Sequence, residues 1–267
     1  MGIFGYSHAW RVIILASAMA WFGPAADLTA GTPDSSGASE LSGRSREPFG
    51  LLASTLFTGG VRDKWRALER KLDDERVQLA LCDGDRDRCV SPAALQFLAI
   101  VDNARAREGR ARLGEINRAI NLAIRPMSDL AQYGEIDVWS SPLATFWHGA
   151  GDCEDYAIAK FVALRQAGIS PDDIRIVIIR DTIRGEDHAV AAARLDGHWL
   201  TLDNRRMAMV EDAYVRNYRP LFVIDQNGIM QYTDAPLPAD VADRDRDVPP
   251  PVALNLNVQP GLISPAN

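Results

Sequence analysis

One cysteine, Cys153, lies in a stretch of the sequence that is rich in acids, GAGDCEDY at residues 149–156. Asp152 precedes it, Glu154 follows it, and Asp155 is one residue further along. A carboxylate on each side raises the pKa of a thiol by charge repulsion, which makes the thiol a poorer nucleophile unless something cancels the charge. These residue types leave two interpretations open: an inert buried cysteine beside a helix cap, or a reactive thiol whose acidic neighbours are occupied elsewhere.

The residues after this stretch predict a helix over 154–167, because apolar side chains recur at helical spacing and Gly168 is a suitable stop. Gly151 and Asp152 would form its cap, so Cys153 lies in the first turn. Unpaired backbone N–H groups at a helix N-terminus lower the pKa of a nearby thiol. The thiolate still needs a base on another element, held in place by a third group.

His188 is the histidine best placed to be this base, because it begins a predicted strand. Asp203 ends the next predicted strand, and a turn at Asp196-Gly197 joins the two strands. A hairpin around this turn pairs residues whose numbers sum to about 391 or 393, which brings Asp203 opposite the region of His188. The remaining histidines lie in the N-terminal segment, in a loop and after a turn glycine: His8, His148 and His198.

Cys153, His188 and Asp203 then form a workable nucleophile, base and orienting acid, in that order along the chain. Val190 and Ala192 share the predicted strand face of His188, and we expect their small side chains to leave room for docking against the helix. Each of the three residues alone is typical of a core cysteine, a solvated histidine or an aspartate in a turn. The helix start and the two paired strands together favour catalysis.

The spacing of the apolar residues predicts an α+β fold, with N-terminal helices followed by an antiparallel β-sheet. Ser91 before Pro92 is typical of a helix start, and Pro126 stops the third helical stripe. Gln226-Asn227-Gly228 is a second hairpin signal. The predicted helices lie near 61–79, 92–101 and 113–124, and the predicted strands cover 174–179, 189–195, 198–202, 221–224 and 229–232 in the order of a meander.

The chain divides into four predicted segments. Arg11 precedes the apolar run VIILASAMAWF, which is followed by small residues and is too short to span a bilayer comfortably. We therefore expect a signal peptide over 1–26; an uncleaved membrane anchor is the alternative, and both put the rest of the chain outside the cytoplasm. A linker over 27–49 leads to one domain over 50–232 and a Pro-rich mobile tail over 233–267.

The composition agrees with an exported protein that does not bind nucleic acid. The chain has 267 residues and a net charge of −7, so nothing predicts a basic face. Cys82 and Cys89 enclose a polar loop with a turn at Asp83-Gly84, and the pair can close a disulfide ring in an oxidising compartment. Their spacing does not match a zinc site, which leaves Cys153 as the odd thiol.

Three segments, DCED at 152–155, DHAV at 187–190 and LDN at 202–204, resemble the transglutaminase-like cysteine peptidases of bacteria, the LapG type. The resemblance implies a papain-like or transglutaminase-like fold and a Cys-His-Asp triad that hydrolyses peptide bonds in the periplasm. The implied substrate is the N-terminal region of a large surface adhesin, cut near paired alanines to release biofilm cells. The resemblance also implies inhibition by an inner-membrane receptor that responds to cyclic-di-GMP.

The same resemblance implies that the enzyme uses calcium, with Asp152, Glu154 and the adjacent Asp155 as ligands. Carboxylate oxygens suit Ca²⁺, and a divalent ion would cancel their field on the thiol. The alternative is that Asp152 only caps the helix while the next two acids favour its positive end. Three acids are too few for a full shell, so backbone carbonyls, water or a distant acid such as Asp137 would complete it.

Two other functions fit the same residues. Transglutaminases transfer the acyl group to an amine, and they share with peptidases a covalent acyl-enzyme intermediate. A non-catalytic exported binding module on the same scaffold is the second alternative. The triad residues favour an enzyme, and the acceptor of the acyl group stays open.

Overall fold

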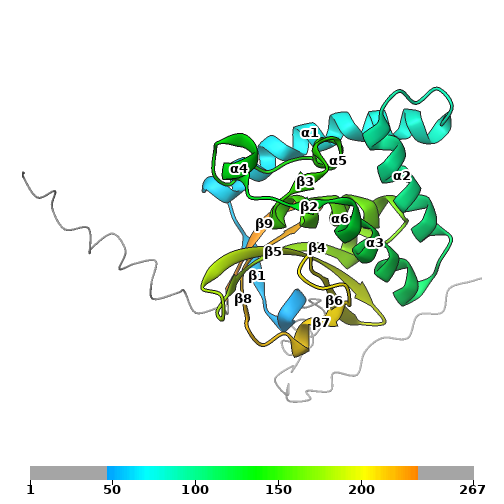
Figure 1. Cartoon of the computed structure of the whole chain (residues 1–267). Helices are drawn as coiled ribbons and strands as arrows, with labels where there is room; N and C mark the ends of the chain where they lie inside the picture. Colours follow the sequence, from blue (N-terminus) through cyan, green and yellow to red (C-terminus); the bar gives the residue numbers. More distant parts are fainter. Residues whose placement is uncertain (1–46, 234–267) are drawn as a thin grey trace, which may run out of the picture. The chain divides into compact units, whose positions relative to one another are not determined.

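Residues 47–233 are described by the computed structural model, which packs helices against one face of a β-sheet (Figure 1). The predicted signal peptide at 1–26 lies outside the described residues, with most of the predicted linker and tail. Glu47, in the predicted linker, accepts a hydrogen bond of 2.6 Å from Nε of Arg175, so the described chain is in contact with the sheet from its first residue. No helix in the described range is long and apolar enough to cross a membrane.

The predicted helices are present, and short ones lie between them. Ser91 Oγ accepts a hydrogen bond of 3.2 Å from the Ala94 N–H, which confirms the predicted cap. The helices are α1 (Gly60–Gly84), α2 (Pro92–Arg105), α3 (Gly109–Ala123), α4 (Asp129–Tyr133), α5 (Pro142–His148) and α6 (Cys153–Gln166). Three 3₁₀ turns accompany them: η2 (Pro48–Gly50), η3 (Pro171–Asp173) and η4 (Asp212–Tyr214).

The main sheet is antiparallel throughout, with the order β1-β9-β8-β4-β5-β6-β7. Its strands are β1 (Ala53–Thr55), β4 (Ile174–Asp181), β5 (Glu186–Leu195), β6 (His198–Leu202), β7 (Val210–Glu211), β8 (Tyr218–Asp225) and β9 (Gly228–Tyr232). The predicted meander is wrong at one step, because the chain after β7 crosses over and β8 pairs with β4. A separate parallel pair joins β2 (Arg125–Pro126) to β3 (Ala150–Gly151).

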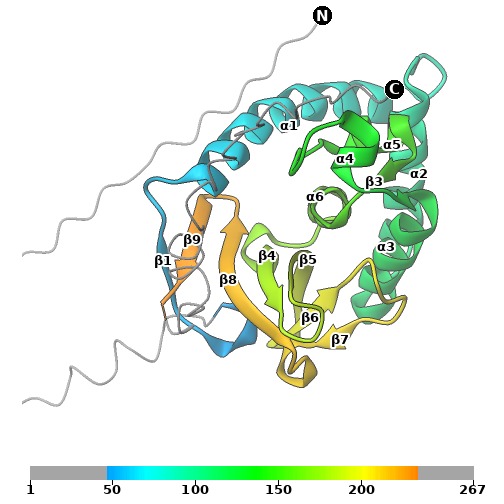
Figure 2. The ribbon, with the colours of Figure 1, turned by 60° about the vertical axis from the view of Figure 1, so that its left-hand side comes forward.

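Helix α6 lies near the middle of the described body, with the other helices on one side and β4 and β5 on the other (Figure 2). The alanines of β5 that join its core cluster are Ala189, Ala191 and Ala193. Val190 and Ala192 belong to a second cluster on the opposite face of the sheet. The predicted docking face is therefore wrong by one residue, since alternate side chains of a strand point to opposite faces.

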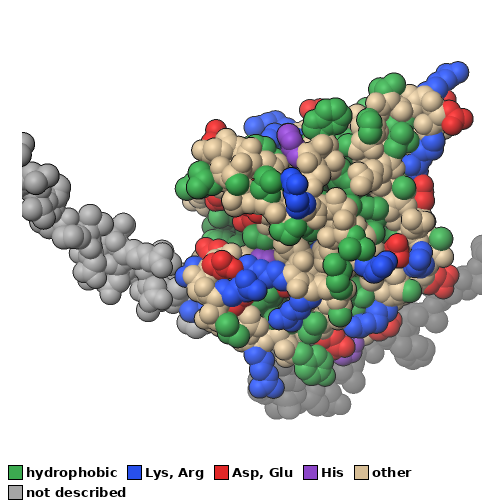
Figure 3. Space-filling model, viewed as in Figure 1, with side chains coloured by type: hydrophobic (Ala, Val, Ile, Leu, Met, Phe, Trp, Pro, Cys, Tyr) green, Lys and Arg blue, Asp and Glu red, His purple; other side chains and the backbone are tan. Residues whose placement is uncertain are grey.

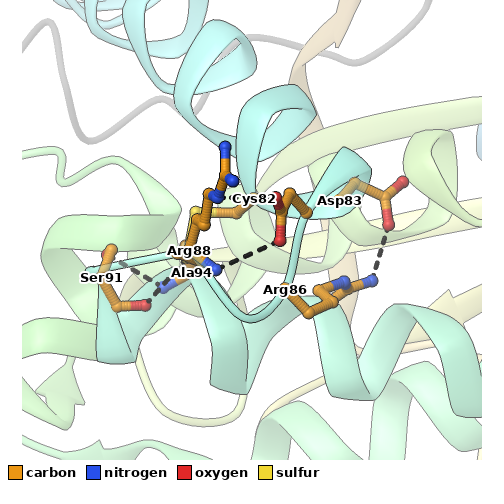
Figure 4. The surroundings of a disulfide bond; sticks show 8 residues. Cys82, Asp83, Arg86, Arg88, Ser91 and Ala94 are labelled. Carbon is orange, nitrogen blue, oxygen red and sulfur yellow. Dashed lines mark hydrogen bonds and ion pairs between the residues drawn. A yellow bond between two sulfur atoms is a disulfide. The ribbon is translucent and has the colours of Figure 1, made fainter.

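Two surface features complete the fold. A disulfide joins Cys82 to Cys89, as predicted, and bridges the end of α1 and the loop before α2 (Figure 4). Beside it, Arg86 donates a hydrogen bond of 2.6 Å to Asp83. On the face in Figure 3, acidic and basic side chains are interspersed.

Candidate active site

Cys153 is the first residue of α6, and Asp152 occupies the N-cap position. The parallel β2–β3 pair holds the chain immediately before it, with Pro126 opposite Gly151. A Cβ atom at Gly151 would lie 2.5 Å from Oδ2 of Asp155, so glycine is needed for the Asp155 carboxylate to approach the backbone. The chain at Gly151 therefore brings Cys153 close to Asp152 and Asp155.

The Cys153 sulfur contacts both an acid and the sheet. Its S–H donates to Oε2 of Glu154 at 2.8 Å, and the sulfur accepts a hydrogen bond from the backbone N–H of Ala189. Burial and the charge of Glu154 raise the thiol pKa well above its usual range, against the lowering effect of the Ala189 N–H. Burial and Glu154 therefore oppose the predicted lowering of the thiol pKa by the helix N-terminus.

His188 and Asp203 form a buried pair at the end of the β5–β6 hairpin. Their Nε2 and Oδ1 atoms are 2.9 Å apart. The ladder places Ala191 opposite Leu202, which confirms the larger of the two predicted registers. A carboxylate only accepts, so Nε2 carries the hydrogen and a neutral imidazole leaves Nδ1 as an acceptor. Nδ1 is buried and has no hydrogen-bond partner among the described residues.

Asp203 has three side-chain hydrogen bonds. Oδ1 also accepts the Arg205 N–H at 2.9 Å, and Oδ2 accepts the Tyr218 hydroxyl at 2.6 Å. Burial alone would raise the pKa of Asp203, but the hydrogen bond and charge of His188, with those two donors, hold it well below its usual range. The carboxylate is therefore ionised at neutral pH and fixed at both oxygens.

Two buried side chains tie this strand end to the helices. Lys160 of α6 donates to the Leu202 carbonyl at 3.2 Å, and Asn121 of α3 donates to the Asp203 carbonyl at 3.0 Å. Burial lowers the pKa of Lys160 to about 7, although the charge of Asp203 opposes this shift. The sequence did contain a signal for Lys160, a cation between apolar residues, two turns after the cysteine on the same helix.

One acid that the sequence analysis missed, Asp129 at the start of α4, joins two of the three predicted acids. Oxygens of Asp129, Asp152 and Asp155 lie within 4.8 Å of one another, and a second group of the same kind joins Asp152, Cys153 and Glu154. Oδ1 of Asp129, Oδ1 of Asp152 and Oδ2 of Asp155 are all buried without a hydrogen-bond partner among the described residues.

This donor set fits a divalent cation. Burial, together with the charge of Glu154, raises the pKa of Asp152, and burial raises the pKa of Asp155 to about 7. Unpaired buried carboxylate oxygens are costly, and hard oxygens are the ligands that Ca²⁺ prefers. Asp152 occupies the N-cap position of α6, but its side chain makes no capping hydrogen bond.

Several other residues from the sequence analysis lie elsewhere. Asp137 pairs with Lys64 of α1 and accepts a hydrogen bond of 2.9 Å from the Trp139 indole, so it does not complete the acid group. His148 packs edge-to-face against Tyr133, with ring centroids 5.8 Å apart. His198 lies on the surface, 3.6 Å from an oxygen of Glu211.

The arrangement has the parts of an acyl-transfer site. It contains a thiol at a helix start, a histidine whose free nitrogen can accept a proton, and an ionised acid that orients the ring. The backbone N–H of Cys153 is available as a donor to a developing oxyanion. The predicted roles of Cys153, His188 and Asp203 agree with this geometry and remain predictions.

The model of a family described as bacterial transglutaminase-like cysteine proteinase matches residues 78–227. Legionella pneumophila LapG is 20% identical over 58% of this chain and 84% of that chain, with a TM-score of 0.48. Its calcium-bound form is also 20% identical, over 58% of this chain and 90% of that chain, with a TM-score of 0.47. A transglutaminase structure is 13% identical over 49% of this chain and 37% of that chain, with a TM-score of 0.34. No curated protein matches the sequence.

Proposed function

Since the chain belongs to the bacterial transglutaminase-like cysteine proteinases and is a cysteine peptidase, we propose that it is a calcium-dependent endopeptidase that uses Cys153, His188 and Asp203. One observation carries the proposal. The 2.9 Å bond between His188 and Asp203 leaves Nδ1 of the buried ring unpaired, at the residue next to the Ala189 N–H that contacts the sulfur.

The proposed reaction has two halves. His188 Nδ1 takes the proton of the Cys153 thiol, and the thiolate attacks the scissile carbonyl carbon while the Cys153 N–H stabilises the oxyanion. The C–N bond breaks, and the leaving amine takes the proton from the imidazolium. A water molecule then gives a proton to Nδ1 and attacks the thioester; the C–S bond breaks, and the imidazolium returns this proton to the sulfur, which restores the thiol and the neutral histidine. Asp203 keeps its charge throughout and stabilises the imidazolium.

Calcium is the cofactor that the acids would hold, with Asp129, Asp152 and Asp155 as ligands and Glu154 at the edge of the site. When bound, it supplies positive charge that offsets the field of these acids on the thiol. The three unpaired buried oxygens support this part of the proposal. The positive charge of the ion would also offset the charge of Glu154, whose Oε2 accepts a hydrogen bond of 2.8 Å from the Cys153 thiol.

The substrate and compartment follow from the resemblance of the DCED, DHAV and LDN segments to the LapG type. We propose export to the periplasm by the signal peptide at 1–26, and cleavage in the N-terminal region of a large surface adhesin, which would control biofilm attachment. An inner-membrane receptor that responds to cyclic-di-GMP would inhibit the enzyme. Mass spectrometry of the mature protein from a periplasmic fraction tests the first point, and an intact 1–26 segment would contradict it.

The experiment that tests the reaction uses the purified chain with calcium and the N-terminal region of an adhesin from the same organism. New peptide termini, found by mass spectrometry and absent with Cys153→Ala, are expected. Ammonia release with an added amine, and no new termini, would instead favour transglutaminase-type amide transfer. If a thiol-directed acylating probe does not label Cys153, a non-catalytic binding module becomes the better account.

A further inference from the structure

We propose that Tyr218 is a positioning residue that holds Asp203, and through it His188, in the orientation needed for proton transfer. The inference rests on the proposed triad and adds a residue to it. Tyr218 is the first residue of β8, and its side chain is largely buried, with 7% of its surface exposed. Nothing in the local sequence marked it as part of the site.

Two contacts of Tyr218 converge on the base. Its hydroxyl donates to Oδ2 of Asp203 at 2.6 Å, and its ring packs edge-to-face against the His188 ring, with centroids 5.8 Å apart at 65°. The same tyrosine therefore contacts both partners of the 2.9 Å hydrogen bond between His188 and Asp203. A residue that only filled space beside the sheet would need the ring contact alone.

The topology explains how a distant residue reaches this pair. Two strands, β4 and β5, separate β8 from β6 in the sheet, and Tyr218 pairs with Asp181 at the end of β4 (Figure 2). Because β6 ends at Leu202, Asp203 lies beyond the ladder; His188 holds its Oδ1, and its Oδ2 needs a restraint other than strand pairing. The Tyr218 hydroxyl supplies that restraint from across the sheet.

The chemistry of the three groups fits this role. Without the hydroxyl, Oδ2 of Asp203 would lose the hydrogen-bond donor that it has among the described residues, and the carboxylate could rotate about its Cβ–Cγ bond. Burial and the charge of Asp203 raise the pKa of Tyr218 above its ordinary value, so the hydroxyl remains a donor at neutral pH. The restraint on Asp203 is thus present at neutral pH.

The test compares Tyr218→Phe with Tyr232→Phe. Both tyrosines are buried in the same sheet and both hydroxyls donate one hydrogen bond, but that of Tyr232 goes to the Pro48 carbonyl at 3.1 Å, in the N-terminal segment. The probe is iodoacetamide in the presence of calcium, and the alkylation rate of Cys153 is followed from pH 5 to pH 10. This rate reports the thiolate that His188 creates, and it needs no protein substrate.

We expect Tyr218→Phe to slow alkylation of Cys153 at neutral pH by about 10- to 100-fold, as for loss of a hydrogen bond to a charged group. Tyr232→Phe should keep the wild-type rate. In an Asp203→Asn background, Tyr218→Phe should have no further effect, because it acts through that carboxylate. A merely structural role would slow the double variant again.

The outcomes separate this inference from the proposed function. If His188→Ala alkylates as fast as the wild type, the triad fails and the role of Tyr218 fails with it. If His188→Ala is slow but Tyr218→Phe matches the wild type, the triad stands and only the present inference is overturned. Unfolding of Tyr218→Phe, measured by circular dichroism beside Tyr232→Phe, would assign the hydroxyl to the fold and also overturn it.

Discussion

The two sides of the site differ in how far the protein alone completes them. On the base side, each carboxylate oxygen of Asp203 has a donor, and Nδ1 of His188 is the one atom of the pair's side-chain N and O atoms without a partner among the described residues. On the nucleophile side, Asp129, Asp152 and Asp155 each have one buried oxygen without a hydrogen-bond partner among the described residues, and Glu154 accepts a hydrogen bond from the Cys153 thiol. The hydrogen bonds on the base side already orient His188, whereas the carboxylates on the nucleophile side have negative charge and oxygen atoms that a cation would bind.

This difference suggests a division of labour. Hydrogen bonds from rigid strands and helices can orient a histidine permanently, because neutral and charged donors are available along the chain. Four acids near one thiol cannot satisfy one another, because like charges raise one another's pKa. A cation that neutralises them would make the nucleophile conditional on calcium while the base stays ready.

The largest expected effect comes from removing either reacting group. Cys153→Ala and His188→Ala should each lower kcat by about 10³–10⁶-fold, with the thermal midpoint of Cys153→Ala nearly unchanged. His148→Ala and His198→Ala are the matched controls and should keep most of the activity. A peptide-cleavage assay checks this, and full activity in His188→Ala would move the base to another residue.

A smaller loss is expected when the orienting acid is changed but kept in size. Asp203→Asn should lower kcat by about 10²–10⁴-fold, since an amide can hold the ring in the wrong tautomer. Asp225→Asn changes another buried acid of the same sheet and should leave kcat unaltered. Equal rates for Asp203→Asn and the wild type would remove Asp203 from the mechanism.

Changes on the nucleophile side should be conditional on calcium. Excess chelator should stop cleavage, and Ca²⁺ should restore it better than Mg²⁺, which tolerates irregular oxygen cages poorly. Asp152→Ala, Glu154→Ala and Asp129→Asn should each lose about 10- to 100-fold in activity at limiting calcium. Asp137→Asn is the control, since this acid pairs with Lys64 instead. If cleavage is undiminished in excess chelator, these acids do not activate the enzyme by binding calcium.

The smallest effect concerns stability and pH. Lys160 has a folded-state pKa of about 7, below the ordinary 10.5, so between these values the unfolded chain binds more protons. Stability should therefore rise with pH across this window, by at most about 1.4 kcal/mol per pH unit from this group. In Lys160→Met that contribution should vanish. Urea unfolding at several pH values tests this prediction. If the free energy of unfolding changes with pH in the same way in the wild type and in Lys160→Met, the lowered pKa of Lys160 is refuted.

The sequence predicted the local part of the site well. The hairpin turn fixes the register of β5 and β6, so simple arithmetic brought His188 and Asp203 together. Cys153 was placed by helix periodicity, which is also a local signal. The face that docks on α6 was predicted wrongly, because both faces of β5 carry small residues and their sizes did not distinguish them.

Tyr218 and Asp129, which the sequence did not predict, are brought to the site by contacts between segments that are distant in the sequence. The position of Tyr218 is set by the crossover that pairs β8 with β4, and the sequence around Tyr218 contains no turn signal that predicts this pairing. Asp129 follows β2, and it reaches Asp152 and Asp155 because β2 pairs in parallel with β3, just before the nucleophile. Pairings of this kind are set by the whole core, so a short stretch of sequence carries little information about them.

Calorimetric titration with Ca²⁺ tests the difference between the two sides most directly. It would compare the wild type with Asp129→Asn on the nucleophile side and Asp203→Asn on the base side. Our account predicts one calcium site in the wild type, loss of that site in Asp129→Asn, and unchanged binding in Asp203→Asn. Absence of binding in the wild type, or loss of binding in Asp203→Asn with Asp129→Asn unaffected, would contradict it.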